Sequence, residues 1–211
     1  MDLPTLRARV RRDLHDEDAS EYRWSDSVLD RHLARAVQEV SLSAPLEAQV
    51  TLSTTAGSRD LALASLGAIV SVEAVEYPTG QYPPCFAAFT TWAGTLTLLV
   101  DGAPAAGEGV LVRYTKLHAL DGSGTTLPDA LVELVATGAG AYAALEWASF
   151  ATNRVNVGGT ETWRHYHTWA QERLAAFAKS LAKLGRERRV RVGRLYQPAS
   201  GAVSQRPPQA S

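Results

Sequence analysis

The sequence predicts an α+β fold, in which a helical domain of about four helices is built from both chain ends and carries an inserted antiparallel β domain and an extended C-terminal tail. Two observations lead to this fold class. Apolar residues recur at helical spacing near both ends of the chain, and strand-length apolar runs separated by turn residues fill the middle. We expect the helical domain to comprise 1–48 and 119–185, the β-sandwich or barrel-like domain 49–118, and the tail 186–211.

The first two helices are predicted from their apolar stripes and from one start signal. In residues 3–14, the apolar stripe runs beside Arg7, Arg9, Arg11 and Arg12. After the acidic stretch HDEDASE, Ser25 is a favourable N-cap, and Trp24 and Leu29 are spaced for a hydrophobic staple. The second helix should then bury the stripe Val28, Leu29, Leu33, Ala36, Val37 and Val40.

The rest of the chain follows the same reasoning. Five or six antiparallel strands are predicted between 49 and 118. Pro128 can open a helix that runs to about residue 151 and has a broad apolar face. The last helix should run from about 160 to 184, with Thr160 as a candidate N-cap and Gly185 as the residue that ends it.

Composition excludes several classes of protein. The formal net charge of −1 gives no overall attraction to nucleic acid or membrane. The single cysteine, Cys85, cannot form an intrachain disulfide and is interpreted as an unreactive thiol, which fits a reducing cytoplasm. The longest charge-free run, 77–100, contains three prolines and is interpreted as strands and turns, so we expect no membrane span.

No motif for catalysis, cofactor binding or metal binding is present in the sequence. His165 and His167 lie two positions apart on a predicted helix, so their side chains point in different directions and cannot bind one metal. Gly138 and Gly140 lack the context of a dinucleotide-binding loop, and their small size instead allows another helix to approach closely. We therefore expect no enzyme and no cofactor.

The basic segment near the C-terminus is the strongest functional signal from composition. Between residues 183 and 194, six basic residues stand against Glu187, which gives +6 − 1 = +5. Two interpretations remain open: a solvated charged terminus, or a segment that becomes ordered on a partner. Alternation of basic and apolar residues from Arg188 to Tyr196 favours the second, because a peptide added to a sheet edge uses alternate side chains.

The segment YRWSDSVLDRHLARAVQEVS resembles the start of the second helix in phage head–tail connector proteins, also called adaptor or head-completion proteins, which also occur in gene transfer agents. The short first helix, the acidic loop and the late helix ETWRHYHTWAQERLAAFAKSLAKL fit the same family, so the resemblance covers the helical parts, about half of the chain. The β segment is similar to that of larger adaptors with an inserted β domain.

The resemblance implies a structural virion protein at the head–tail neck, assembled in the host cytoplasm. Subunits would form a ring, usually of twelve, between the portal protein and the next connector or tail-completion protein, and DNA would pass through the channel without sequence-specific contacts. The tail would bind the portal through Arg188, Arg189, Val190, Arg191, Val192, Arg194, Leu195 and Tyr196. Candidates for contacts between subunits are Tyr22, Arg23, Arg31, Arg35, Trp163, His165 and His167.

The broad apolar face of the helix after Pro128 is expected to be covered by neighbouring subunits. The alternative function is a nucleic-acid-binding regulator that uses the basic tail and the arginine-rich first helix. It predicts strong, salt-dependent binding of DNA by the chain alone, and the near-neutral net charge argues against it.

Overall fold

The computed structural model describes residues 1–151 and 161–195, with side chains to Arg189. It confirms the predicted α+β fold class. The described chain divides into two compact units, a helical unit of Met1–Leu46 and Lys116–Val190 and a β unit of Glu47–Thr115. No described helix is both long enough and apolar enough to cross a membrane.

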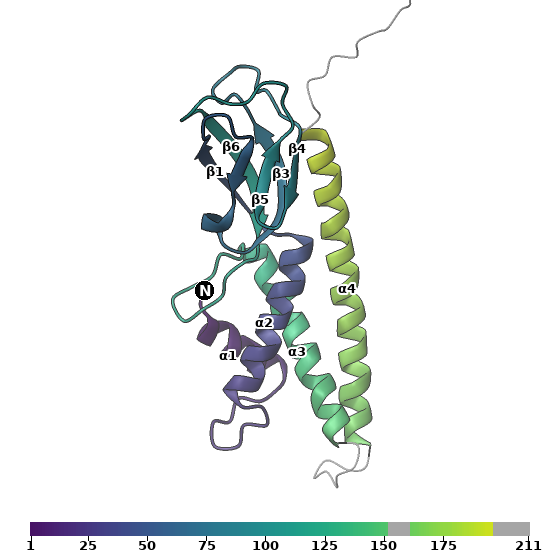
Figure 1. The fold of residues 1–211 in the computed structure, drawn as a ribbon. Coiled ribbons are helices and arrows are strands. Elements are labelled where there is room, and N and C mark those ends of the chain that lie inside the picture. The colour runs from purple at the N-terminus through teal and green to yellow at the C-terminus, as the bar shows by residue number, and fades with distance from the viewer. Residues whose placement is uncertain (152–160, 196–211) are drawn as a thin grey trace, which may run out of the picture. The chain divides into compact units, whose positions relative to one another are not determined.

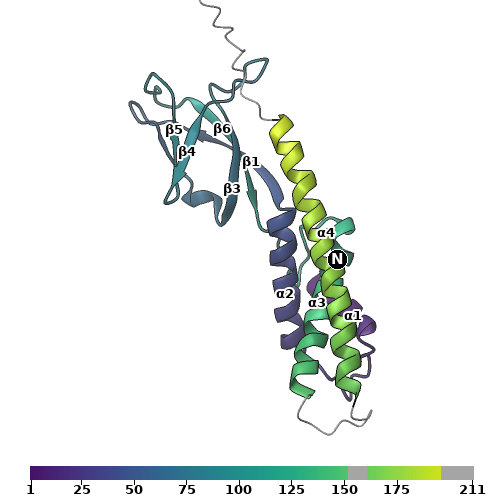
Figure 2. The same ribbon diagram turned by 90° about the vertical axis from the view of Figure 1, so that its right-hand side faces the viewer.

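Four helices form the helical unit: α1 (Leu3–Asp13), α2 (Asp26–Ser43), α3 (Asp129–Ala151) and α4 (Thr162–Leu195). Ser25 caps α2 as predicted, and its side chain accepts a hydrogen bond from the Val28 backbone N–H at 3.4 Å. In both views α4 runs alongside α3 (Figures 1 and 2). All four helices contribute to one hydrophobic core.

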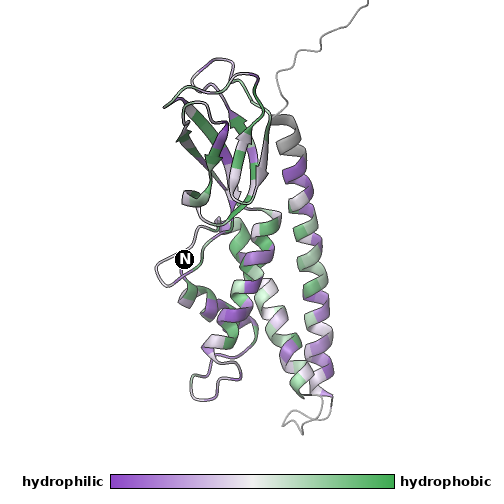
Figure 3. Cartoon of the chain, viewed as in Figure 1, coloured by the Kyte–Doolittle hydropathy of each residue, from purple (hydrophilic) through white to green (hydrophobic). Residues whose placement is uncertain are grey.

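Helix α3 lies at the centre of this core and is covered within its own chain. Its buried residues point in all directions around the helix axis, as expected for a helix that is apolar all round. In Figure 3, α3 is white to green over most of its length, whereas α4 carries purple, hydrophilic positions along its length. For most of this face, the prediction that neighbouring subunits cover it is therefore wrong, because α1, α2 and α4 pack against it, although Phe150 near the end of the helix is 57% exposed.

Gly138 explains how closely α3 and α4 approach each other. A Cβ built on Gly138 would lie 2.8 Å from the ring of Phe177, which is almost fully buried in α4. The missing side chain therefore leaves the space that the phenyl ring fills. This bears out the prediction that small residues in this helix allow another helix to come close.

The β unit contains β1 (Leu46–Ser53), β2 (Asp60–Ala62), β3 (Ile69–Glu76), β4 (Phe89–Trp92), β5 (Thr95–Leu98) and β6 (Gly109–Lys116), with a short 3₁₀ helix at Ala64–Leu66. The strand orders are β1-β6-β3 and β2-β5-β4, and both sheets contribute to a second hydrophobic core. Strands β4 and β5 pair antiparallel across Ala93 and Gly94. Both of these residues have positive φ, as the tight turn of a two-residue hairpin requires.

One predicted boundary is wrong. Helix α4 does not end at Gly185 but continues to Leu195, so the extended, strand-like conformation predicted for 186–195 is wrong as well. A glycine inside a helix costs only about 1 kcal/mol relative to alanine, and the lysines and arginines on both sides of it are good helix formers, so the helix continues through Gly185. Thr160, the predicted N-cap, and Tyr196 lie outside the described residues.

Candidate functional site

A buried arginine holds the loop between α1 and α2 in place. The side chains of Arg11 and Asp16 are each only 5% exposed, and Arg11 Nη1 donates to Asp16 Oδ2 at 2.6 Å. Arg11 Nη2 donates to the Trp24 carbonyl at 2.9 Å and to Asp26 Oδ1 at 2.7 Å. Asp16 Oδ1 also accepts the Arg23 backbone N–H at 2.7 Å. Because these bonds tie both ends of the loop to α1, its conformation is fixed.

The indole of Trp24 ties the same loop to α3. Trp24 is buried, and its Nε1 donates to the backbone carbonyl of Ala143 at 3.1 Å. The segment YRWSD, which carries much of the family resemblance, is therefore mainly an internal structural element. Asp26, its last residue, has its pKa lowered because its carboxylate accepts from Arg11 and lies near Arg7.

The other arginines of α1 are also paired within the chain. Arg7 binds Asp26 at 2.7 Å and Asp30 at 2.8 Å. Arg9 pairs with Glu133 of α3, and the exposed Arg12 lies 3.4 Å from Glu17. These ion pairs neutralise the basic side of the first helix.

Two of the predicted contact residues, Tyr22 and Arg23, lie at the end of this loop. The guanidinium carbon of Arg11 lies 3.5 Å from the centroid of the Tyr22 ring, yet Tyr22 remains 43% exposed. Arg23 donates to the Tyr166 hydroxyl of α4 and lies 4.6 Å from the centroid of the Trp147 ring. Tyr22 thus keeps a free outer edge, whereas Arg23 mainly connects the loop to α4.

Arg31, the first of two candidates on α2, is bound to a glutamate of α3. It pairs with Glu146, whose carboxylate also lies 2.5 Å from Nε2 of the buried His32. Burial lowers the pKa of His32, although the hydrogen bond and the negative charge of Glu146 act to raise it. Although burial acts to raise the pKa of Glu146, the hydrogen bonds from Arg31 and His32 lower it overall.

Arg35, the second candidate on α2, belongs to a similar cluster. It lies 3.1 Å from Glu39 and 3.8 Å from the centroid of the Tyr142 ring. The Tyr142 hydroxyl donates to both oxygens of Glu39 at 2.8 Å. Burial, assisted by this bond to Glu39, raises the pKa of Tyr142 to about 12. These contacts are internal to the α2–α3 pair.

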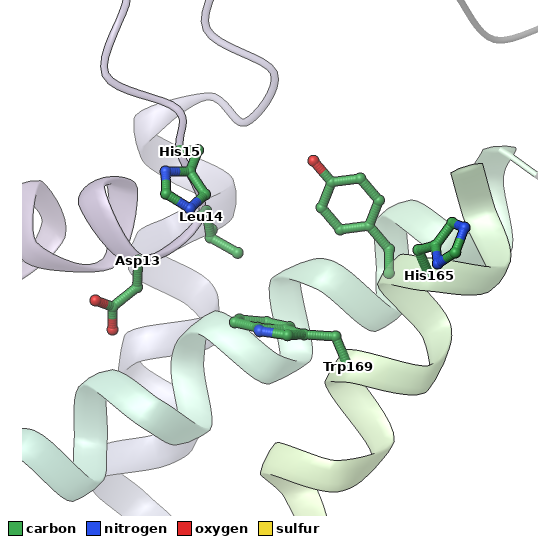
Figure 4. A pocket seen from close by; sticks show the side chains of 6 residues that line it. Asp13, Leu14, His15, His165 and Trp169 are labelled. Atoms are coloured by element: carbon green, nitrogen blue, oxygen red, sulfur yellow. The ribbon is translucent and has the colours of Figure 1, made fainter. Parts of the chain in front are cut away.

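The remaining candidates lie at the start of α4. Trp163 is partly buried beside Arg164, and His165 is exposed. His165 lines a pocket of about 300 Å³ with Leu14, His15 and Trp169, and Trp169 extends from α4 toward Leu14 (Figure 4). His167 does not line this pocket. Over residues 1–151 and 161–195, no group of three or more His, Cys, Asp or Glu side chains is placed to hold a metal ion.

The basic C-terminal half of α4 borders a second depression in the helical unit. A groove of about 410 Å³ lies between the end of α2 and α4. Its walls include Leu42, which is 55% exposed, and Leu181. Arg186, Arg188 and Arg189 line it as well, and Gly185 lies among them. Of the predicted portal-binding residues, Arg188 and Arg189 thus lie on a helix beside an apolar groove.

Sequence reasoning missed the acidic partners of these arginines. Asp16, Glu39 and Glu146 each accept from an arginine or a neighbouring polar group of another segment. The sequence contains one signal for them, because an aspartate five residues after Arg11 is within reach once α1 ends. The pairs with Glu146 span more than 100 residues and have no local signal.

The comparison with known families decides the identity of the chain. The SU10 adaptor protein family matches residues 1–200. The chain belongs to this family. This confirms the resemblance drawn from the first two helices and the late helix.

Two further comparisons add little to the SU10 adaptor family assignment. No curated protein matches the chain. Among solved structures, the chain is similar to one from the neck of an empty GTA particle, at 15% identity and a TM-score of 0.28, over 80% of this chain and 88% of that chain. At this TM-score, the likeness carries no argument about function.

Proposed function

We propose that this SU10 adaptor family member is a structural, non-enzymatic head–tail adaptor of a phage-like particle. The observation that carries the proposal is the family match over residues 1–200, nearly the whole chain. Copies would form a ring, with twelve as the expected number, between the portal protein and the next connector or tail-completion protein. DNA would pass through the channel without sequence-specific contacts, and the protein would reside in the neck of the virion after assembly in the host cytoplasm.

The helical unit supports this proposal by its rigidity. Its loops and helices are connected by ion pairs and hydrogen bonds that satisfy Arg11, Asp16, Trp24 and Glu146 inside the chain. A ring subunit needs such a fixed shape, because an error in the angle between neighbours adds up around the ring.

The C-terminal half of α4 supports portal binding, in a mode that differs from strand addition. Residues 188–195 are helical, whereas addition of a strand to a sheet edge needs an extended segment. The portal-binding segment remains Arg188, Arg189, Val190, Arg191, Val192, Arg194, Leu195 and Tyr196. We expect this basic segment to contact the portal. Each subunit of the ring would contribute one such contact, so that individually weak contacts together give strong binding.

The alternative of a nucleic-acid-binding regulator is less well supported. Arg7, Arg9, Arg11 and Arg12 all lie in ion pairs within the chain. Binding DNA phosphates with them would require these pairs to break. Tight, salt-dependent binding of DNA by the isolated chain would favour this alternative.

Graded truncation tests the portal-binding segment. Deletion of 196–211 removes the part outside the described helix, and deletion of 190–211 removes the last turns of α4 as well. We expect the longer deletion to abolish co-sedimentation with purified portal rings while the circular dichroism per residue stays helical. Charge reversal by Arg164→Glu, at an exposed position near the other end of α4, serves as the control for a change of charge on this helix. Normal portal binding after deletion of 190–211 would refute the assignment of residues 190–196 to portal binding.

Localisation tests the adaptor function independently of the segment. Immunogold labelling of intact particles should place the protein at the neck, and particles made without it should accumulate as heads that lack tails. Tailed particles formed in its absence would exclude an adaptor role.

A further inference from the structure

Gly185 lies inside helix α4, and no contact among the described residues requires a glycine at this position. Helix α4 continues for ten residues beyond it, to Leu195, and glycine is the least favourable residue after proline in a helix interior. Gly138 in α3 has a reason, because the ring of Phe177 fills the space of its missing Cβ. A Cβ built on Gly185 meets no described atom within 4 Å. Gly185 therefore leaves an open notch on the surface of the helical unit.

The notch lies in the groove between α2 and α4, which combines apolar and basic side chains. Leu42 and Leu181 provide the apolar part, and Arg186 and Arg189 are exposed beside it. Leu42 is 55% exposed and offers an open apolar surface at the end of α2. An occupant of this groove should carry an aromatic or aliphatic side chain for the notch and carboxylates for the arginines.

The loop between α1 and α2 carries such side chains. Glu17, Asp18 and Glu21 are all exposed, and they directly precede Tyr22, which is 43% exposed. We call residues 17–22 the acidic loop. The buried bonds of Asp16 fix its position, so little conformational freedom would be lost when it binds.

We propose that the groove at Gly185 receives the acidic loop of a second copy of this chain, with Tyr22 at the notch and Glu21 near Arg189. Arg189 would then contact the neighbouring subunit, and the residues that follow it would remain for the portal. The proposal rests on the proposed function, because it names the contact between neighbouring adaptor subunits. Charge complementarity selects the loop: the exposed carboxylates of Asp18 and Glu21 lie near its tyrosine, and the exposed Arg186 and Arg189 lie beside the notch. The packing of Phe177 on Gly138 is an example within this chain of a ring seated on a helical glycine.

The positions of the two surfaces determine the kind of assembly. The acidic loop precedes the first residue of α2 and the groove includes the end of α2, so the 18-residue helix separates them by roughly 27 Å. A contact between two different surfaces is heterologous, which builds a ring or an open filament rather than a two-fold dimer. In a closed ring every loop must lie at the height of every groove, so the axis of α2 must be roughly perpendicular to the ring axis.

Blocking the notch is the first test. Gly185→Trp fills the notch, and Gly185→Ala, which adds only a methyl group and favours the helix, is the matched control. Association of the full-length chain is measured by sedimentation velocity into the high micromolar range, with circular dichroism to confirm that both variants stay folded. We expect Gly185→Trp to weaken self-association by roughly tenfold or more and Gly185→Ala to change it little.

A charge exchange then identifies the occupant. Arg189→Glu and Glu21→Arg should each weaken self-association. The double variant should regain much of the loss, because the ion pair between the two positions forms again with the acidic and the basic residue exchanged. Lys183→Glu, at an exposed position of the same helix that is not among the residues lining the groove, should leave self-association unchanged.

Each result decides between the proposals. Wild-type self-association that neither Gly185→Trp nor Arg189→Glu alters would overturn the groove as an interface, as would a chain that stays monomeric at every concentration. Loss in Arg189→Glu without recovery in the double variant would overturn the acidic loop as its occupant. The adaptor function does not depend on these outcomes, since labelling of the particle neck tests it separately.

Discussion

Replacement of Arg11 by alanine tests whether the buried pair with Asp16 holds the α1–α2 loop in place. Both side chains are 5% exposed, so the substitution would leave the Asp16 carboxylate buried without its cationic partner. It would also remove the donor to the Trp24 carbonyl. Removal of one partner from a buried ion pair costs about 3–5 kcal/mol. Arg12→Ala, the next residue, breaks only an exposed pair at 3.4 Å and should cost less than about 1 kcal/mol.

Urea unfolding followed by tryptophan fluorescence measures the difference. A Trp92→Phe background removes the one tryptophan of the β unit, so the signal reports on the helical unit. A further Asp16→Asn change in the Arg11→Ala protein should recover part of the loss, because it removes the buried charge. Equal losses of unfolding free energy in Arg11→Ala and Arg12→Ala would refute the reasoning.

Three further substitutions test other contacts of the helical unit. Gly138→Val should destabilise it by about 1–3 kcal/mol, because the new side chain overlaps the ring of Phe177, and an unchanged urea midpoint would contradict this. Burial lowers the pKa of His32 below its ordinary value of about 6.5, so just below that pH the unfolded chain binds more protons than the folded chain. The contribution of His32 to stability should therefore be complete above about pH 6.5 and be lost as the pH falls further. His32→Gln, which keeps a donor near Glu146, should flatten this dependence of the urea midpoint, and an equal slope in both proteins would rule out His32 as its source. Trp24→Phe should cost about 1–3 kcal/mol, because it removes the indole hydrogen bond to the Ala143 carbonyl and shortens a buried side chain, and thermal unfolding at the wild-type temperature would argue against it.

The sequence was most informative where the controlling interactions are local. The start of α2 depends on Ser25 and the residues that directly follow it, and the structure has the predicted cap. The chain is helical throughout Asp129–Ala151, as its apolar pattern and its small residues predict. The six strands also follow from short patterns and from turn residues such as Ala93 and Gly94.

The sequence was least informative where a residue's role depends on a distant partner. The end of α4 was wrongly placed at Gly185, because glycine after an amphipathic stretch usually ends a helix and nothing local shows otherwise. The apolar face of α3 was assigned to neighbouring subunits, although α4 covers it through Phe177. Arg23 and Arg31 stay candidates for contacts between subunits, and no local pattern indicates their partners Tyr166 and Glu146, which are more than 100 residues away in the sequence.

The discontinuous helical unit has a consequence for synthesis in the cell. The chain leaves this unit at Leu46 and returns at Lys116, and its core is closed only when Phe177 and Ala170 of α4 are added. On the ribosome, α1 and α2 would therefore lack their packing partners α3 and α4 until the whole β unit has been synthesised. A chain that stops before α4 would expose the apolar surface of α3, which favours degradation. Only chains translated to near the end would thus reach the pool from which particles are assembled.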